Sequence, residues 1–161
     1  MNPLYDELLI EEMIEENLQS VAEIENLCFS SPWSYNALSS ELDNPLAVYF
    51  VVKLAENVVG YAGMHHVLDE GYIANIAVHP GFRKKGFATA LLNKLQDFAQ
   101  KTVLAMLTLE VRATNQTAIS IYHNFGFEKV GLRHNFYDNP REDGIIMTKF
   151  LKHQNETDVL P

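Results

Sequence analysis

The sequence predicts one α/β domain with a mixed central sheet and helices on both of its faces. The chain has 161 residues, the usual size of a single domain, and its 47% hydrophobic content can build a sizeable core. β-rich runs alternate with segments of helical periodicity, and residues 73–99 have the pattern of a strand, a glycine-containing turn and an amphipathic helix. We expect residues 1–151 to form the domain and residues 152–161 to form a polar tail.

The N-terminal half predicts two helices followed by two strands. Apolar side chains after Leu18 recur with approximate helical spacing as far as a break at residues 30–32. A shorter helix is expected between Ser34 and Asn44, and residues 55–57 separate two β-rich runs as a hairpin turn does. The expected elements are a strand at 7–13, a helix at 18–29, a short helix after 34, and strands at 48–54 and 58–67.

The C-terminal half predicts a strand–turn–helix unit and a closing pair of antiparallel strands. His79-Pro80-Gly81 ends the strand of that unit. From Gly86 onward, apolar residues recur at the spacing of a helix that packs on a sheet, and Gly126 is placed to cap a later helix. The expected elements are strands at 71–78 and 104–111, helices from 86 and at 116–125, and closing strands at 127–136 and 144–151.

Charge and cysteine content restrict the class of protein. The net charge of −9 disfavours nonspecific binding to nucleic acid or anionic membranes, and it favours a basic peptide or an amine as partner. The N-terminal segment is acidic where a signal peptide is basic, so we expect a cytoplasmic protein. The one cysteine, Cys28, cannot form an internal disulfide, and its apolar neighbours predict a buried structural thiol. The histidines lack ligand spacing, so we expect no metal.

Residues 83–89 form a basic turn that could bind an anion. They lie between a strand and a helix, where free backbone N–H groups and the positive end of the helix face outward. Gly86 lets the backbone approach a ligand, and three consecutive cations precede it. The turn lacks the ending of a P-loop and the three glycines of a dinucleotide fingerprint. An ordinary basic helix start with a turn glycine explains this turn equally well.

Two stretches, Asn75–Pro80 and Arg83-x-x-Gly86-x-Ala88, resemble the acetyl-coenzyme A motif of the GCN5-related N-acetyltransferase (GNAT) superfamily. The resemblance covers nearly the whole chain in the order of elements. It implies a sheet of six to seven strands with a splayed central pair, a pantetheine arm beside one splayed strand, and a pyrophosphate on the turn amides. The implied cofactor contacts are Ile76, Ala77, Val78, Arg83, Lys84, Lys85, Gly86, Phe87, Ala88 and Thr89.

Three polar residues of the second half have both a structural and a functional explanation. Glu110 projects from an otherwise apolar strand, and an ion pair with Arg112 or a neighbouring strand explains it more simply than catalysis. Tyr122 lies on the apolar stripe of its helix, where a core aromatic with its hydroxyl at the edge is usual. Asn115 is a natural N-cap for that helix.

Further stretches resemble the RimI subfamily, the ribosomal-protein alanine N-acetyltransferases. They are residues 109–115, 118–122 and 126–127, a Pro-Trp-Ser loop at 29–34, and a late segment at 133–143 in which Phe136 replaces a tyrosine. The resemblance implies that Glu110 is a general base, Tyr122 a general acid and Asn115 a cofactor contact. The implied acceptor-binding residues are Trp33, Arg133, Tyr137 and Asp143.

The resulting hypothesis is direct acetyl transfer from acetyl-CoA to the N-terminal α-amine of a protein, with a ribosomal-protein alanine as the acceptor. The pKa of such an amine is about 8, so deprotonating it is easier than deprotonating a lysine. A backbone N–H of the splayed strand, such as that of Val78, would polarise the thioester carbonyl. Two alternatives remain: a relative acting on a lysine side chain or a small amine, and a non-catalytic acyl-CoA-binding module.

Overall fold

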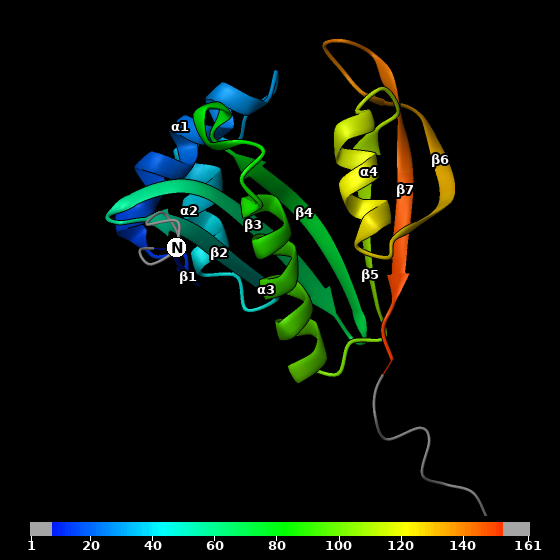
Figure 1. Ribbon diagram of the computed structural model, residues 1–161, viewed down its shortest axis with the longest axis horizontal. Helices are drawn as coiled ribbons and strands as arrows, with labels where there is room; N and C mark the ends of the chain where they lie inside the picture. The colour runs from blue at the N-terminus through cyan, green and yellow to red at the C-terminus, as the bar shows by residue number, and fades with distance from the viewer. Residues whose placement is uncertain (1–7, 153–161) are drawn as a thin grey trace, which may run out of the picture.

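The computed structural model describes residues 8–152, which contain a seven-stranded sheet flanked by helices on both faces (Figure 1). The strand order is β1-β2-β3-β4-β5-β7-β6. The predicted α/β class is confirmed, and the predicted bounds agree with the observed ones to within two residues. The elements are β1 Leu8–Glu12, η1 Glu15–Asn17, α1 Leu18–Cys28, α2 Tyr35–Leu42, β2 Ala47–Leu54, β3 Asn57–Val67, β4 Glu70–Val78, η2 Pro80–Phe82, α3 Phe87–Lys101, β5 Met106–Arg112, α4 Gln116–Asn124, β6 Glu128–Tyr137 and β7 Glu142–Phe150.

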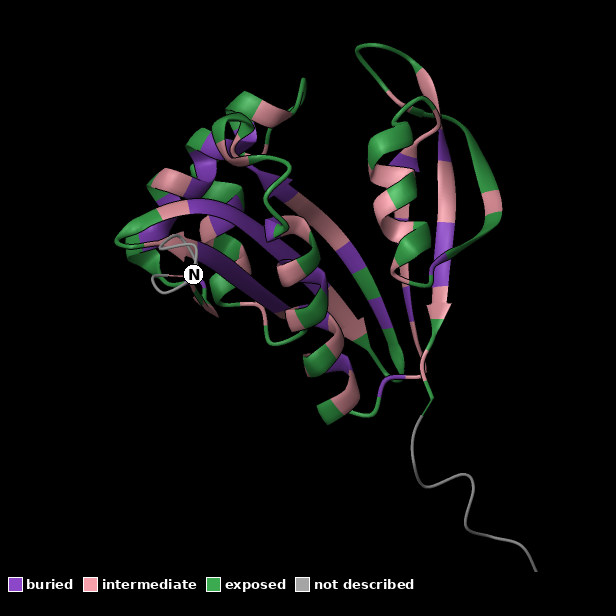
Figure 2. Ribbon diagram, viewed as in Figure 1, coloured by how far each residue is buried: buried purple, intermediate pink, exposed green. Residues whose placement is uncertain are grey.

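Two apolar clusters, one on each face of the sheet, form the core. Strand alternation sends Phe50 and Val52 of β2 into one cluster, and Tyr49 and Val51 into the other. Because both faces are covered, the middle of β2 is a continuous run of buried residues (Figure 2). The edge strand β6 is mostly exposed.

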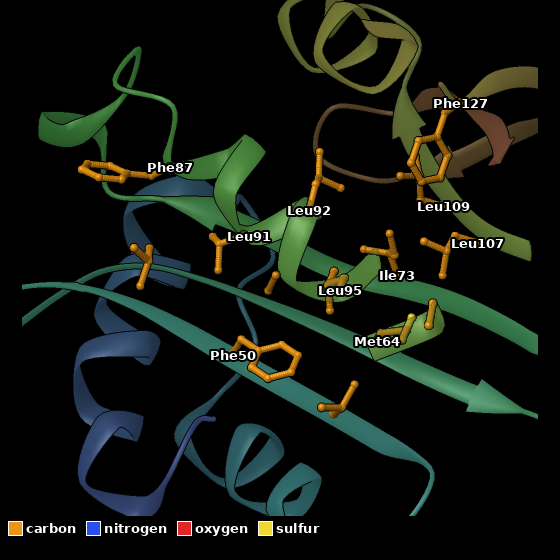
Figure 3. Packing of buried hydrophobic residues seen from close by; sticks show 14 of the residues in the cluster. Phe50, Met64, Ile73, Phe87, Leu91, Leu92, Leu95, Leu107, Leu109 and Phe127 are labelled. Atoms are coloured by element: carbon orange, nitrogen blue, oxygen red, sulfur yellow. The ribbon is translucent and has the colours of Figure 1, made fainter. Parts of the chain in front are cut away.

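The predicted apolar stripe of α3 packs on the first face. Figure 3 shows Leu91, Leu92 and Leu95 of this helix above side chains from several strands. Helices α1 and α2 cover the opposite face with Leu18, Val21, Ile24 and Leu38. Helices therefore hold the sheet from both sides, as the sequence predicts.

The two central strands, β4 and β5, pair over only a short stretch and then separate. The parallel register joins Glu70 to Met106, Gly71 to Leu107 and Tyr72 to Thr108. At Gly71 a Cβ would lie 2.7 Å from Leu107 Cδ2, so glycine leaves room for the Leu107 side chain where the strands pair. Beyond Tyr72 the strands diverge (Figure 1), which confirms the expected splayed pair.

A bulge in β4 lies at the point of separation. The register with β3 passes from Met64–Ile73 to Gly63–Asn75, so Ala74 is an extra residue on β4. Bulges increase the local bend of a strand, and this one redirects the free edge of β4 beside the opening.

Two expectations concern segments at the ends of the chain. Residues 153–161 of the predicted polar tail lie outside the described residues, and the single-domain boundary remains a prediction.

Among residues 8–152, no helix combines the length and the apolar character that crossing a membrane requires.

Candidate active site

A cleft of about 550 Å³ lies where β4 and β5 separate. Its walls come from the end of α1 and the loop after it, the bulged part of β4, the end of β5, α4, and the end of β6 with the loop that follows. The lining residues are Glu25, Cys28, Phe29, Ser30, Ser31, Trp33, Ala74, Asn75, Ile76, Glu110, Val111, Arg112, Asn115, Ala118, Tyr122, Phe136, Tyr137 and Asp138.

Glu110 projects into this cleft because of strand alternation. Its neighbours Leu109 and Val111 are buried in the core, and the Glu110 side chain, 5% exposed, lies on the other face of β5. The hydroxyl of Tyr72 donates to Oε2, and Arg133 Nε lies 3.0 Å from Oε1. An ion pair for Glu110 is therefore confirmed, but its partner is Arg133.

Arg112 is occupied elsewhere, which corrects the suggested Glu110–Arg112 pair. Its Nη1 lies 3.4 Å from Glu142 Oε2, and Nη2 donates to the Asp138 carbonyl at 3.0 Å. The guanidinium lies 4.5 Å from the centre of the Tyr137 ring. Arg112 and Glu110 lie on the same face of β5, and Arg112 uses that position to hold the loop between β6 and β7 against the cleft.

Tyr122 lies on α4 and lines the same cleft as Glu110. Its ring packs edge-on against Phe127, with 6.0 Å between the ring centres. Burial, and to a smaller degree the nearby Tyr137, raise the pKa of Tyr122 to about 12. The phenol therefore stays protonated at neutral pH and can donate a hydrogen bond.

Asn115 is the N-cap of α4, as its sequence context predicts. Its side-chain oxygen accepts from Ala118 N at 3.1 Å. Asn115 also lines the cleft, so the capping role and a cofactor contact are compatible.

The basic turn joins η2 to α3 and has a left-handed backbone at two residues. Lys84 has φ of 63° and Gly86 has φ of 84°. A Cβ at Gly86 would meet no atom within 4 Å, so the glycine is needed here for its φ rather than for space. Gly86 is the N-cap of α3 and has no side chain to cap it, which leaves the first N–H groups of the helix for another acceptor.

The predicted cofactor residues do not all line the cleft. Ile76 and Asn115 line the cleft, whereas the turn from Lys84 to Thr89 lies outside its lining. Arg83 connects the two regions, since its Nε donates to the Val78 carbonyl at 3.3 Å and its Nη2 lies 3.3 Å from Cys28 Sγ. Ala77 and Val78 are buried in β4.

The buried structural thiol predicted at Cys28 is wrong. The residue is half-buried, lines the cleft and donates from Sγ to the Val78 carbonyl at 3.4 Å. The reason is that α1 ends at Cys28, so this side chain lies at the C-terminal end of β4, beside the Val78 carbonyl.

The predicted acceptor-binding residues do not all meet in the cleft. Trp33 and Tyr137 line it. Arg133 reaches it through Glu110. Asp143 lies outside the lining, where its Oδ1 accepts from Asn135 N at 2.8 Å and lies 3.0 Å from His134 Nδ1. Their contacts with an acceptor remain predictions.

The sequence reasoning missed a buried polar cluster around Glu25. The carboxylate of Glu25, a residue only 1% exposed, accepts from Tyr61 OH, from Asn75 Nδ2 at 2.8 Å and from Trp33 N at 2.9 Å. Burial and the Glu25 charge raise the pKa of Tyr61, so its hydroxyl remains a donor. One signal was available: Glu25 lies on the apolar face of α1, where a carboxylate is unusual.

In the part of the chain that the structure describes, no group of three or more histidine, cysteine, aspartate or glutamate side chains could hold a metal ion.

Comparison with known proteins identifies the family. The profile of the acetyltransferase (GNAT) family matches residues 18–127, more than half of the chain. The chain is 37% identical over 135 residues to the ribosomal protein bS18-alanine N-acetyltransferase of Escherichia coli K12, covering 81% of this chain and 89% of that protein. The enzyme of the same description from Haemophilus ducreyi is 34% identical over 148 residues, covering 89% and 100%.

A solved structure agrees with this relationship. The crystal structure of the ribosomal-protein-S18-alanine N-acetyltransferase from Escherichia coli superposes with a TM-score of 0.85 at 32% identity, covering 93% of this chain and 97% of that one. The same family is indicated by the splayed strands, by the profile match over residues 18–127 and by these relatives. The chain belongs to the acetyltransferase (GNAT) family and is an acetyl-CoA-dependent N-acetyltransferase.

Proposed function

We propose that this enzyme transfers the acetyl group of acetyl-CoA to the N-terminal alanine of ribosomal protein bS18, with the cytoplasm as its place of action. The observation that carries the proposal is the convergence of Glu110 and Tyr122 on one cleft beside the splayed strands. The names of the relatives support the acceptor.

In the proposed reaction, the free α-amine attacks the thioester carbonyl, forming the C–N bond while the C–S bond breaks. Glu110 accepts the proton that the amine loses, directly or through a water. Tyr122 donates its proton to the departing sulfur, so that charge does not accumulate on the thiolate. The pKa of about 12 keeps Tyr122 protonated and ready for this role throughout the physiological range.

Arg133 has a specific part in this proposal because it occupies Glu110 before the reaction. Its side chain is 55% exposed and can be rehydrated when it leaves, whereas the Glu110 side chain, 5% exposed, then requires another cation. An entering cationic acceptor can replace Arg133 at the carboxylate, which brings the amine and its base together.

Peptide assays test the proposal. Purified protein should release CoA thiol with acetyl-CoA and a synthetic peptide carrying the bS18 N-terminus, and mass spectrometry should place the acetyl group on the alanine nitrogen. A matched peptide with a blocked N-terminus and a free lysine should remain unmodified. Acetylation of that lysine, or of a small amine in preference to the peptide, would support a different acceptor class. Tight acetyl-CoA binding without turnover on any amine would support the binding-module alternative.

A further inference from the structure

The loop that follows α1 supplies one wall of the cleft, and Glu25 is the side chain that connects this loop to the sheet. Trp33 N, within the loop, donates to Glu25 Oε2 at 2.9 Å. The other oxygen, Oε1, accepts from Tyr61 of β3 and Asn75 of β4. One carboxylate therefore binds a loop amide and two adjacent strands.

The contact with β4 lies beside the bulge. Asn75 follows the extra residue Ala74, and both line the cleft together with Trp33 and Glu25. Any shift of Glu25 therefore changes the spacing between the Trp33 wall and the free edge of β4. Under the proposed function, the acceptor enters between this wall and the splayed strands.

The chemistry of the cluster argues against a purely structural origin. A buried carboxylate is costly to desolvate, and within residues 8–152 no cationic side chain lies within ion-pair distance of Glu25. Three neutral donors stabilise it instead, and hydrogen bonds to a charged acceptor are the stronger kind. An apolar side chain could fill the same space without this cost but could not hold a loop amide.

We propose that Glu25 is a positioning residue that sets acceptor affinity by holding the Trp33 loop against β4. The inference rests on the proposed function for its kinetic consequence. Its structural consequence, the placement of the loop, can be measured without turnover.

Glu25→Gln tests the inference because an amide keeps the size of the side chain but has only one acceptor oxygen. With that oxygen toward Tyr61 and Asn75, the amide nitrogen faces Trp33 N, and two donors oppose each other. We expect the KM for the acceptor peptide to rise at least about tenfold, the lower end of the loss expected for one hydrogen bond to a charged group. The KM for acetyl-CoA and kcat should stay within about twofold of wild type.

Two matched variants distinguish the effect of loop placement from a general loss of stability and from the loss of a negative charge. Tyr61→Phe removes the hydroxyl that donates to Glu25 and accepts from Asn75 but leaves the Trp33 amide bond in place, so it should lower Tm and raise the acceptor KM less than Glu25→Gln does. Glu41→Gln removes a carboxylate that pairs with His65 outside the cleft, and its kinetics should equal those of wild type. If Glu25→Gln fails to fold, Glu25→Asp retains the charge but is too short to reach the loop and both strands.

Trp33 is the single tryptophan of the chain, so its fluorescence reports the loop directly. Acrylamide quenching should increase in Glu25→Gln and stay at the wild-type level in Glu41→Gln. Unchanged quenching would overturn the inference whatever the activity, and so would an equal rise in KM for acceptor and acetyl-CoA. A wild-type enzyme that acetylates no N-terminal peptide would refute the proposed function, while the quenching comparison would still decide whether Glu25 holds the loop.

Discussion

Replacing Tyr122 by phenylalanine removes one hydroxyl from the cleft and little else. The ring retains its edge-on packing against Phe127 at 6.0 Å, so the free energy of unfolding should change by no more than about 1 kcal/mol. A positioned proton donor contributes roughly 10²–10⁴-fold to a rate. We therefore expect kcat to fall by at least about 100-fold, with the KM for acetyl-CoA within about threefold of wild type.

The pH profile gives a second, independent measurement. Because the pKa of Tyr122 is raised to about 12, the acid stays protonated below that pH and should cause no fall in wild-type kcat between pH 7 and 10. Thiol release at saturating acceptor between pH 7 and 10 measures the kcat of the wild type and of Tyr122→Phe. Tyr49→Phe is the control, since Tyr49 lies outside the cleft and its buried hydroxyl has no hydrogen-bond partner among the described residues. A Tyr122→Phe kcat within about threefold of wild type would remove Tyr122 from the acid role.

Three further predictions concern the basic turn at Gly86, the Glu142–Thr114 contact and the Lys149 side chain of β7. Gly86→Glu places a carboxylate at the left-handed N-cap of α3 and should abolish acetyl-CoA binding in calorimetry while unfolding stays cooperative. Gly86→Ala adds only the backbone strain of a left-handed alanine and should bind acetyl-CoA more strongly than Gly86→Glu. Hydrogen bonds from Thr114 hold the pKa of Glu142 below 4.5, so the Tm advantage of wild type over Glu142→Gln should be full at pH 6 and shrink as the pH falls below about 4.5; a constant difference would contradict it. Lys149→Met loses hydrogen bonds of 2.6 Å to Gln96 Oε1 and to the Phe125 carbonyl. The free energy of unfolding, measured in urea, should fall by about 1–2 kcal/mol. An unchanged urea midpoint would show that these bonds do not contribute to stability.

Periodicity predicted most of the fold because the relevant contacts repeat along the chain. The stripe of Leu91, Leu92 and Leu95 marks the buried face of α3, and the hairpin turn at residues 55–57 joins two strands that pair. The splay of β4 and β5 was expected only through the family resemblance. Periodicity could not give it, because the end of the β4–β5 register at Tyr72 and the bulge at Ala74 correspond to no repeating spacing in the sequence.

The polar contacts of the site were harder to predict because their partners are distant in sequence. Glu110 lies on β5 and its partner Arg133 on β6, with β7 between these strands in the sheet. Glu25 meets Tyr61 and Asn75 across separations of 36 and 50 residues. Local pattern gives the face on which such a side chain lies, whereas the choice of partner depends on strand order.

The short pairing of β4 with β5 also has a mechanical consequence. Residues 70–72 are the only stretch of β4 that is in register with β5, and they lie at one end of the cleft. Beyond Tyr72, no ladder hydrogen bond within the described part of the chain joins the β1–β4 part of the sheet to the β5–β7 part. Packing of α3 against β5 and β7, together with the hydrogen bond from Lys149 Nζ to Gln96 Oε1, therefore sets the width of the opening.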